Sequence, residues 1–164
     1  MDFLSSQSLY LCIDQGGHAS RSIVFNQQGE ILASAYCDIK TEHPAKYFVE
    51  HNADDVIHSI NRSIQQVLEQ LGDKKNNIIS AGLATQRSNI VCWHKETGKA
   101  LSPIISWQDR RNTKWMKQFD DKNKSIHKTT GLFLSPHYGA SKLRWCLENI
   151  TEVKQALDDN LLAF

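Results

Sequence analysis

A short glycine-rich stretch, Asp14-Gln-Gly-Gly-His18, is the first place in this chain where the residue types could support chemistry. It lies between two apolar runs, Leu9–Ile13 and Ser22–Phe25, which have the length and branching of strands. An aspartate delivered by a strand into such a turn can hold a hard metal ion, and the backbone N–H groups of the turn can bind phosphate oxygens. An ordinary hairpin, in which Asp14 starts the turn and the glycines supply positive φ, explains the same residues. Both interpretations stay open at this point.

Two further candidate residues lie at or near the ends of predicted strands. Arg87 comes soon after the apolar run Ile78–Ala84, which we expect to be a buried strand, and ligands bind at the carboxyl ends of strands in open α/β sheets. Trp107 ends the apolar run Pro103–Trp107, and its ring could form a wall against the apolar face of a sugar or polyol. A solvated loop arginine and a half-buried core tryptophan are the structural alternatives.

Three predicted strands position the glycine-rich turn. They are Leu9–Asp14, Arg21–Asn26 and Glu30–Asp38, and Gly29 lies in the turn between the last two. Consecutive strands joined by tight turns form an antiparallel meander.

A long amphipathic helix is predicted after the meander. Asn52 or Asp54 can cap its first turn, and Gly72 is a stop signal. Its apolar positions, expected to face the core, are Val56, Ile57, Ile60, Ile64, Val67, Leu68 and Leu71. Because the strand Ile78–Ala84 comes next, the order predicts a crossover onto the same sheet and a mixed α/β fold.

The remaining elements are shorter. Residues 39–52 are expected to form a loop, and Ile90–His94 and Pro103–Trp107 are predicted strands. The predicted helices are Thr113–Phe119, Ile126–Thr130 stopped by Gly131, Ala140–Asn149, and Glu152–Asn160 capped by Thr151.

Composition argues against several classes of protein. The net charge is +1 with no broad basic field, so nucleic acid or an anionic membrane is not expected as the main partner, and the apolar runs are too short to span a bilayer. Residues 1–7 lack the features of a signal peptide and are expected to be a loose leader. None of the seven histidines stands in a recognised metal-ligand spacing. The cysteines are widely spaced, which favours buried free thiols in a reducing cytoplasm; they are Cys12, Cys37, Cys92 and Cys146.

Several short motifs occur in an order that resembles one protein family. They are Ile13-Asp-Gln-Gly16, Gly29-Glu-Ile-Leu-Ala33, Val49-Glu-His-Asn52, Gln86-Arg87, Thr97-Gly-Lys-Ala-Leu101, Trp107-Gln-Asp-Arg-Arg111 and Lys142-Leu-Arg-Trp145. Together they resemble the N-terminal domain of the FGGY carbohydrate kinases, its glycerol kinases most of all, from about Tyr10 to Phe164. The resemblance implies a ribonuclease H-like, actin-like domain. It also implies an enzyme that uses ATP and Mg²⁺ to phosphorylate a hydroxyl of a sugar or polyol.

The resemblance also implies roles for the candidate residues. Asp14 resembles the acid that helps to hold Mg²⁺, Arg87 the arginine that hydrogen-bonds substrate hydroxyls, and Trp107 the aromatic against the substrate carbon chain. The implied phosphate-binding residues are Asp14, Gln15, Gly16, Gly17, His18 and Arg21, and the implied substrate-binding residues are Arg87, Ser88, Trp107 and His137. The stretch Asp109–Arg111 also matches, without a role for each residue.

Four residues depart from the family pattern. Gly17 and His18 stand where the glycerol kinases have two threonines, so two hydroxyls are lost. Ser88 replaces a glutamate, and His137 replaces a tyrosine. Because sites built to hydrogen-bond a hydroxyl discriminate strongly between substrates, the last two changes predict a polyhydroxy substrate other than glycerol.

Members of this family are much longer than this chain. Their catalytic aspartate and their C-terminal ATP-binding domain are expected beyond Phe164, so no catalytic residue is identifiable here. Residues 8–164 are therefore expected to form part of the substrate-side domain and to be inactive alone. Because sheet partners are missing, we expect an exposed apolar face or edge, and hence a homodimer or a marginally stable monomer. The alternative is a non-catalytic truncated paralogue that binds a polyol or another protein.

Overall fold

The structure is a computed structural model that describes residues 8–164, and the predicted leader, residues 1–7, lies outside them. The described chain forms two compact units. The first comprises residues 8–40 and 54–86, and the second comprises residues 41–53 and 87–164. Each unit has its own apolar core.

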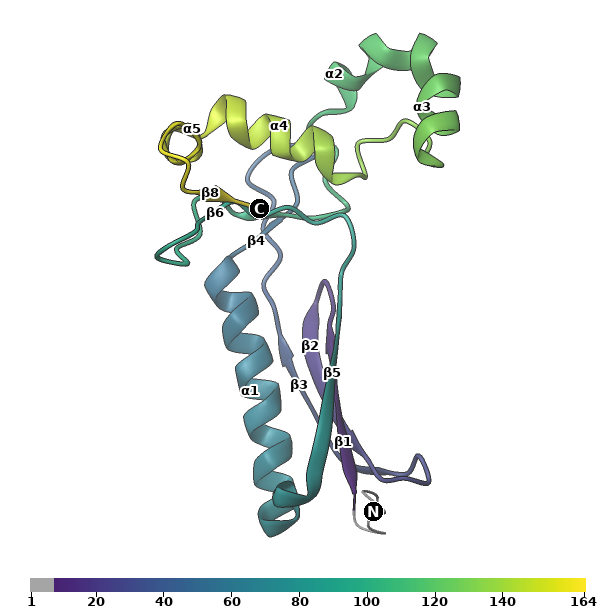
Figure 1. Ribbon diagram of the computed structural model, residues 1–164, viewed down its shortest axis with the longest axis vertical. Helices are drawn as coiled ribbons and strands as arrows, with labels where there is room; N and C mark the ends of the chain where they lie inside the picture. Colours follow the sequence, from purple (N-terminus) through teal and green to yellow (C-terminus); the bar gives the residue numbers. More distant parts are fainter. Residues whose placement is uncertain (1–7) are drawn as a thin grey trace. The chain divides into compact units, whose positions relative to one another are not determined.

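The first unit is built on a four-stranded mixed sheet (Figure 1). Its strands, in the order in which they lie side by side, are β3 (Ile31–Asp38), β2 (Ala19–Phe25), β1 (Leu9–Gln15) and β5 (Ile78–Thr85). Neighbours β1, β2 and β3 pair antiparallel, and β5 pairs parallel with β1. The predicted meander, the crossover and the mixed α/β class are confirmed.

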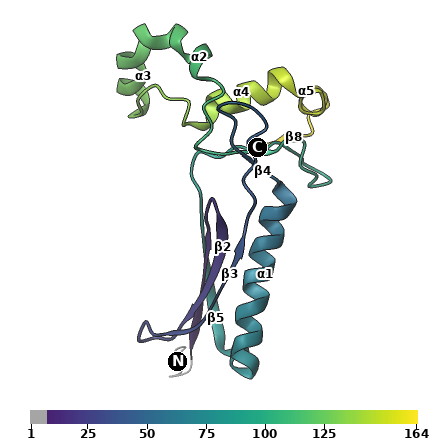
Figure 2. The same cartoon turned by 180° about the vertical axis from the view of Figure 1, so that it is seen from behind.

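Helix α1 (Ala53–Leu71) covers one face of this sheet, as Figure 2 shows from behind, and a 3-10 turn, η1 (Gly72–Asn77), follows it. Val67 and Leu71 of the helix pack with Leu11 and Val24 of the sheet. The interface is less apolar than the sequence predicts, because two buried hydroxyl pairs cross it. They are Ser20–Ser59, with Oγ atoms 2.7 Å apart, and Ser22–Ser63, with Oγ atoms 2.8 Å apart. The predicted core residue Ile57 is 59% exposed instead.

The prediction of a buried strand at Ile78–Ala84 is wrong in its burial. Ile79 is 52% exposed and Leu83 is 58% exposed, because β5 lies at an edge of the sheet with β1 as its partner. Cys12 is also exposed, contrary to expectation, since its neighbours along β1, Leu11 and Ile13, are the ones that join the core beneath α1.

The second unit combines two short strand pairs with helices. Strand β4 (Glu50–His51) pairs with β7 (Ile104–Ile105), and β6 (Trp93–His94) pairs with β8 (Leu162–Ala163). The helical segments are α2 (Thr113–Met116), η2 (Lys117–Lys122), α3 (Asn123–Thr130), α4 (Gly139–Asn149) and α5 (Thr151–Asp158).

Several boundaries in the second unit differ from prediction. The expected loop 39–52 contains β4, the two predicted strands are reduced to β6 and β7, and the C-terminal β8 was not predicted. Thr151 lies inside α5, and Ile150 occupies the N-cap position with no side-chain hydrogen bond. Two-residue strands carry too little pattern to be recognised locally, since a partner strand distant in sequence defines them.

The core of the second unit contains two of the four free cysteines, Cys92 and Cys146, buried beside Ile105 and Val153. Contact with Cys92 and burial raise the pKa of Cys146, which keeps this thiol protonated. Within residues 8–164, no helix is both long enough and apolar enough to cross a membrane.

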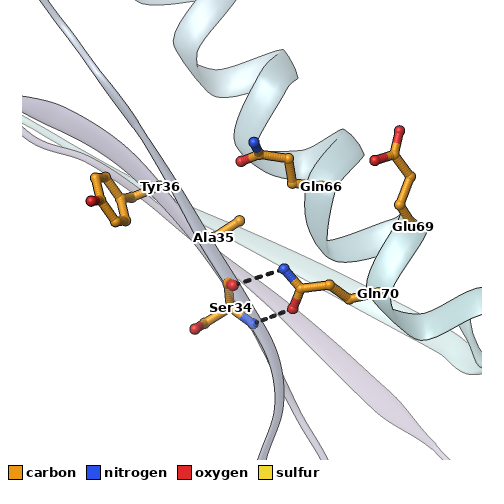
Figure 3. A pocket seen from close by; sticks show the side chains of 6 residues that line it. All are labelled: Ser34, Ala35, Tyr36, Gln66, Glu69 and Gln70. Carbon is orange, nitrogen blue, oxygen red and sulfur yellow. Dashed lines mark hydrogen bonds between the residues drawn. The ribbon is translucent and has the colours of Figure 1, made fainter.

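The edge of the sheet at β3 carries a side-chain block, shown in Figure 3. The Gln70 carboxamide donates from Nε2 to the carbonyl of Ser34 (3.0 Å) and accepts at Oε1 from the Ser34 N–H (3.2 Å). A side-chain amide here imitates the backbone of an adjacent strand. Open edges attract further strands, so Gln70 occupies groups that would otherwise recruit another chain.

We predict that Gln70→Ala lowers the unfolding free energy by about 1 kcal/mol, because two exposed neutral hydrogen bonds are lost. The variant should also self-associate more tightly than the parent chain in sedimentation velocity. Glu69→Ala is the matched control, because Glu69 lies beside Gln70 and accepts a hydrogen bond from Gln65 on the same helix. Equal association of Gln70→Ala and the parent would refute the blocking role.

Candidate functional site

The glycine-rich turn connects β1 and β2 in the first unit. Asp14 lies near the end of β1, is exposed, and stands opposite Arg21 of β2 in the strand register. Gly16 N–H donates to the carbonyl of Ala19 (3.0 Å), and the His18 carbonyl accepts from Ile39 (2.8 Å). The hairpin interpretation therefore describes the backbone, and it leaves the Asp14 carboxylate accessible to a ligand.

The two glycines of this turn lie in close contact with neighbouring oxygen atoms. Neither has positive φ, so that part of the hairpin expectation is wrong. A Cβ on Gly16 would lie 3.1 Å from the Ala19 carbonyl oxygen, and one on Gly17 would lie 3.2 Å from Oε1 of Gln86. Gln86 in turn donates from Nε2 to the carbonyl of Gly16 (3.0 Å). The turn is thus packed against the residue that follows β5.

The oxygen atoms at this turn suit Mg²⁺. Among residues 8–164 no group of three or more histidine, cysteine, aspartate or glutamate side chains could hold a metal. Mg²⁺ does not need such a cage, because it usually keeps several waters and takes one or two carboxylates plus phosphate oxygens. Asp14 offers one exposed carboxylate, and the buried Oε1 of Gln86 has no hydrogen-bond partner among the described residues. These residues therefore fit a phosphate-bound Mg²⁺.

Three of the predicted substrate residues gather in the second unit. The ring of Trp107 stands edge-on to the ring of His137, with centroids 5.7 Å apart, and is 38% exposed. The backbone N–H of Trp107 donates to Oδ1 of Asn89 (2.7 Å), which holds the backbone at Trp107 beside the loop that carries Ser88. We call Ser88, Trp107 and His137 the aromatic cluster.

His137, and not Tyr138, carries the ring that contacts Trp107. Tyr138 instead lines an apolar cavity of about 340 Å³, together with Trp115 and Phe119. The spacing from Gly131 favours His137 for the substrate position, and this assignment stays a prediction.

Arg87 lies next to Ser88 in the chain. Its side chain is exposed and makes no hydrogen bond or ion pair with residues 8–164. An arginine without protein partners keeps all its N–H donors available for a ligand.

The stretch after Trp107 holds the unit together. Asp109 is buried, and its carboxylate accepts from the N–H of Val49 (2.8 Å) and from N, Nε and Nη2 of Arg111 (3.0, 3.0 and 2.8 Å). Arg111 also contacts Glu50 (2.5 Å), and its guanidinium lies 3.9 Å from the Phe48 ring centroid. Arg110 donates from Nη1 to the Trp107 carbonyl (2.9 Å). These residues position Trp107 and stabilise the unit.

Sequence reasoning missed three residues that shape these sites. Gln86 supports the glycine-rich turn, Asn89 holds Trp107, and Lys142 donates to the carbonyls of Ser88 and His137. Gln86 and Lys142 both lay in motifs that pointed to the family. Their residue types did not indicate these roles, because glutamine and lysine are usually surface residues.

We predict that Arg111→Leu lowers the unfolding free energy by about 3–5 kcal/mol, because it leaves the buried Asp109 carboxylate uncompensated. Arg144→Leu is the matched control. Arg144 also pairs with an acid, Glu148, and lies over a ring, Trp115, but it is 37% exposed, so the loss should be about 1 kcal/mol or less. Urea titration measures both values. Equal losses would contradict the central place of the Asp109–Arg111 pair.

Comparisons with known proteins agree with this architecture. Residues 9–163 match the profile of the FGGY family of carbohydrate kinases, N-terminal domain. Glycerol kinase of Acinetobacter baylyi is 36% identical over 159 residues, and that of Natranaerobius thermophilus is 32% identical over 160 residues. Each alignment covers 96% of this chain and 32% of the relative, so the chain spans about a third of the length of these relatives.

Solved structures show the same fold. Plasmodium falciparum glycerol kinase with ADP matches with a TM-score of 0.85 at 24% identity, over 95% of this chain and 32% of that protein. Xylulose kinase of Rhodospirillum rubrum matches with a TM-score of 0.80 at 15% identity, over 86% of this chain and 29% of that protein. The fold is therefore the ribonuclease H-like, actin-like one of these kinases. The chain belongs to the FGGY family of carbohydrate kinases and corresponds to its N-terminal domain.

Proposed function

We propose that this chain is the substrate-side part of an ATP-dependent carbohydrate or polyol kinase similar to the glycerol kinases. The observation that carries the proposal is the aromatic cluster, an exposed tryptophan face bordered by polar residues, in a domain of this family. A polyol has an apolar carbon chain and many hydroxyls, so it needs both kinds of contact.

The aromatic cluster would bind the substrate. The exposed part of the Trp107 ring would pack against the carbon chain, while the imidazole of His137 and the hydroxyl of Ser88 would hydrogen-bond substrate hydroxyls. Arg87, which is exposed and without a protein partner among residues 8–164, would be the main polar anchor. Serine and histidine reach and donate differently from glutamate and tyrosine, so the preferred substrate would be a polyol or ketose other than glycerol.

The glycine-rich turn would act on the phosphates. ATP supplies the γ-phosphate when it is bound, and Mg²⁺ neutralises the charge that develops during transfer. Asp14 would hold Mg²⁺ with one carboxylate, and Arg21 would attract the phosphate charge. The backbone N–H groups of Gly17 and His18 would donate to the phosphate oxygens, while Gln15 and Gly16, whose N–H is bonded to the Ala19 carbonyl, would hold the turn in shape.

The protein would work in the cytoplasm and form a homodimer. Free thiols and the use of ATP favour the cytoplasm. Strand β5 presents an open edge on which Ile79 and Leu83 are exposed, and this surface favours a homodimer. The catalytic base and the ATP-binding domain would lie in the two thirds of the relatives that this chain does not span.

The proposal is tested by joining residues 8–164 to the remaining two thirds of the Natranaerobius thermophilus glycerol kinase. We expect this fusion protein to phosphorylate at least one three- to six-carbon polyol or ketose in the presence of ATP and Mg²⁺. The 164-residue chain alone should be inactive, because the transfer needs both sides of a closed site.

Arg87→Ala in the fusion protein shows whether the activity depends on the proposed site. Losing a charged hydrogen bond costs about 1.5–3 kcal/mol, so kcat/KM should fall about 10- to 150-fold. Arg144→Ala, on α4, is the control and should leave kcat/KM unchanged. A folded fusion protein without activity on the whole panel would favour a non-catalytic binding protein, and unchanged kinetics of Arg87→Ala would overturn the anchor role.

A further inference from the structure

One buried lysine joins the two loops that carry the polar members of the aromatic cluster. Lys142 lies in the first turn of α4 and is 1% exposed. Its Nζ atom donates to the carbonyl of Ser88 (2.7 Å) and to the carbonyl of His137 (2.5 Å). These two residues are far apart in sequence, so a single ammonium group fixes the distance between their loops.

The loop at Ser88 needs such a restraint. Ser88 has φ of +66°, a left-handed conformation that non-glycine residues adopt rarely and keep only where the surroundings impose it. The hydrogen bond from Lys142 to the Ser88 carbonyl acts on the backbone at this residue. It therefore helps to hold the peptide in the orientation that sets where the Ser88 side chain points.

The loop at His137 is held from the same helix. Gly139 begins α4 so close to Ile90 that a Cβ at this position would lie 2.9 Å from the Ile90 side chain. The start of the helix is therefore packed closely against Ile90, and Lys142 ties the His137 carbonyl to this helix. The edge-on contact of His137 with Trp107 depends on this placement.

We propose that Lys142 is a positioning residue that places Ser88 and His137 for binding a polyhydroxy substrate. This inference rests on the proposed function for its substrate, while its structural content concerns the two loops alone. Lys142 acts through the backbone and does not itself touch the substrate.

The charges around Lys142 make the arrangement sensitive to pH. Burial lowers the pKa of Lys142 to about 8; Asp109 opposes this shift, and Arg110 and Arg111 add to it. Charge-assisted hydrogen bonds are roughly twice as strong as neutral ones, so both carbonyls should be held less firmly once the amine loses its proton. The charged groups that act on it are Asp109, Arg110 and Arg111 on the loop before α2, and the titratable residue that it contacts through the backbone is His137 on the loop before α4.

The experiment follows backbone amide signals of the 164-residue chain by NMR as the pH rises through the alkaline range. We expect the signals of Ser88 and Asn89 and those of His137 and Tyr138 to shift together, with one midpoint near 8. Lys142→Met, which keeps the side-chain length but cannot donate, should lose this transition. Lys154→Met, the same change at an exposed lysine on α5, should behave as the parent chain.

The outcomes separate this inference from the proposed function. Independent midpoints for the two loops, or a transition that survives in Lys142→Met, would overturn the inference even if the fusion protein phosphorylates a polyol. A common midpoint in the parent chain supports it even if Lys142→Met fails to fold. In the fusion protein, Lys142→Met should raise KM at least tenfold with a smaller effect on kcat, and an unchanged KM would overturn the positioning role.

Discussion

The buried carboxylate of Asp109 is the group on which the second unit depends. Four N–H donors from Val49 and Arg111 satisfy it, and Arg111 is enclosed by the rings of Phe48 and Trp145. A buried charge is tolerated only when it is paired and hydrogen-bonded, so these contacts restrict where the chain before β4 and the chain after β7 can lie. Trp107 comes two residues before Asp109, and its place at the surface follows from that restriction.

The Asp109 carboxylate also acts on a second cation, the buried ammonium of Lys142. Asp109 raises the pKa of Lys142 against the larger effect of burial, so the lysine can keep its proton at neutral pH while almost fully enclosed. The same acid thus stabilises the unit through Arg111 and helps to maintain an ammonium that holds the Ser88 and His137 loops. Both the stability of the second unit and the geometry of the proposed substrate site therefore depend on the negative charge of Asp109.

The sequence predicted those elements whose pattern is local. The three strands of the meander and helix α1 were found because their periodicities extend over seven residues or more. Strands β4 and β8 have two residues each and depend on distant partners, so no local pattern marks them. The exposure of β5 could not be predicted either, since an apolar run looks the same in the middle of a sheet and at its edge.

Among the site residues too, those marked by a local sequence pattern were predicted and those defined by distant contacts were not. Asp14, Arg87 and Trp107 were predicted from their position at or after the ends of apolar runs. Gln86 and Lys142 could not be predicted in this way, because they act through contacts with backbone atoms distant in sequence.

The central claim is that Ser88, Trp107 and His137 form a substrate-binding surface. The most direct test is to titrate the 164-residue chain with three- to six-carbon polyols and to follow its NMR signals. We expect one compound to cause saturable shifts at residues 87–89, Trp107 and His137. Saturable shifts confined to other residues, or none with any compound, would contradict the account.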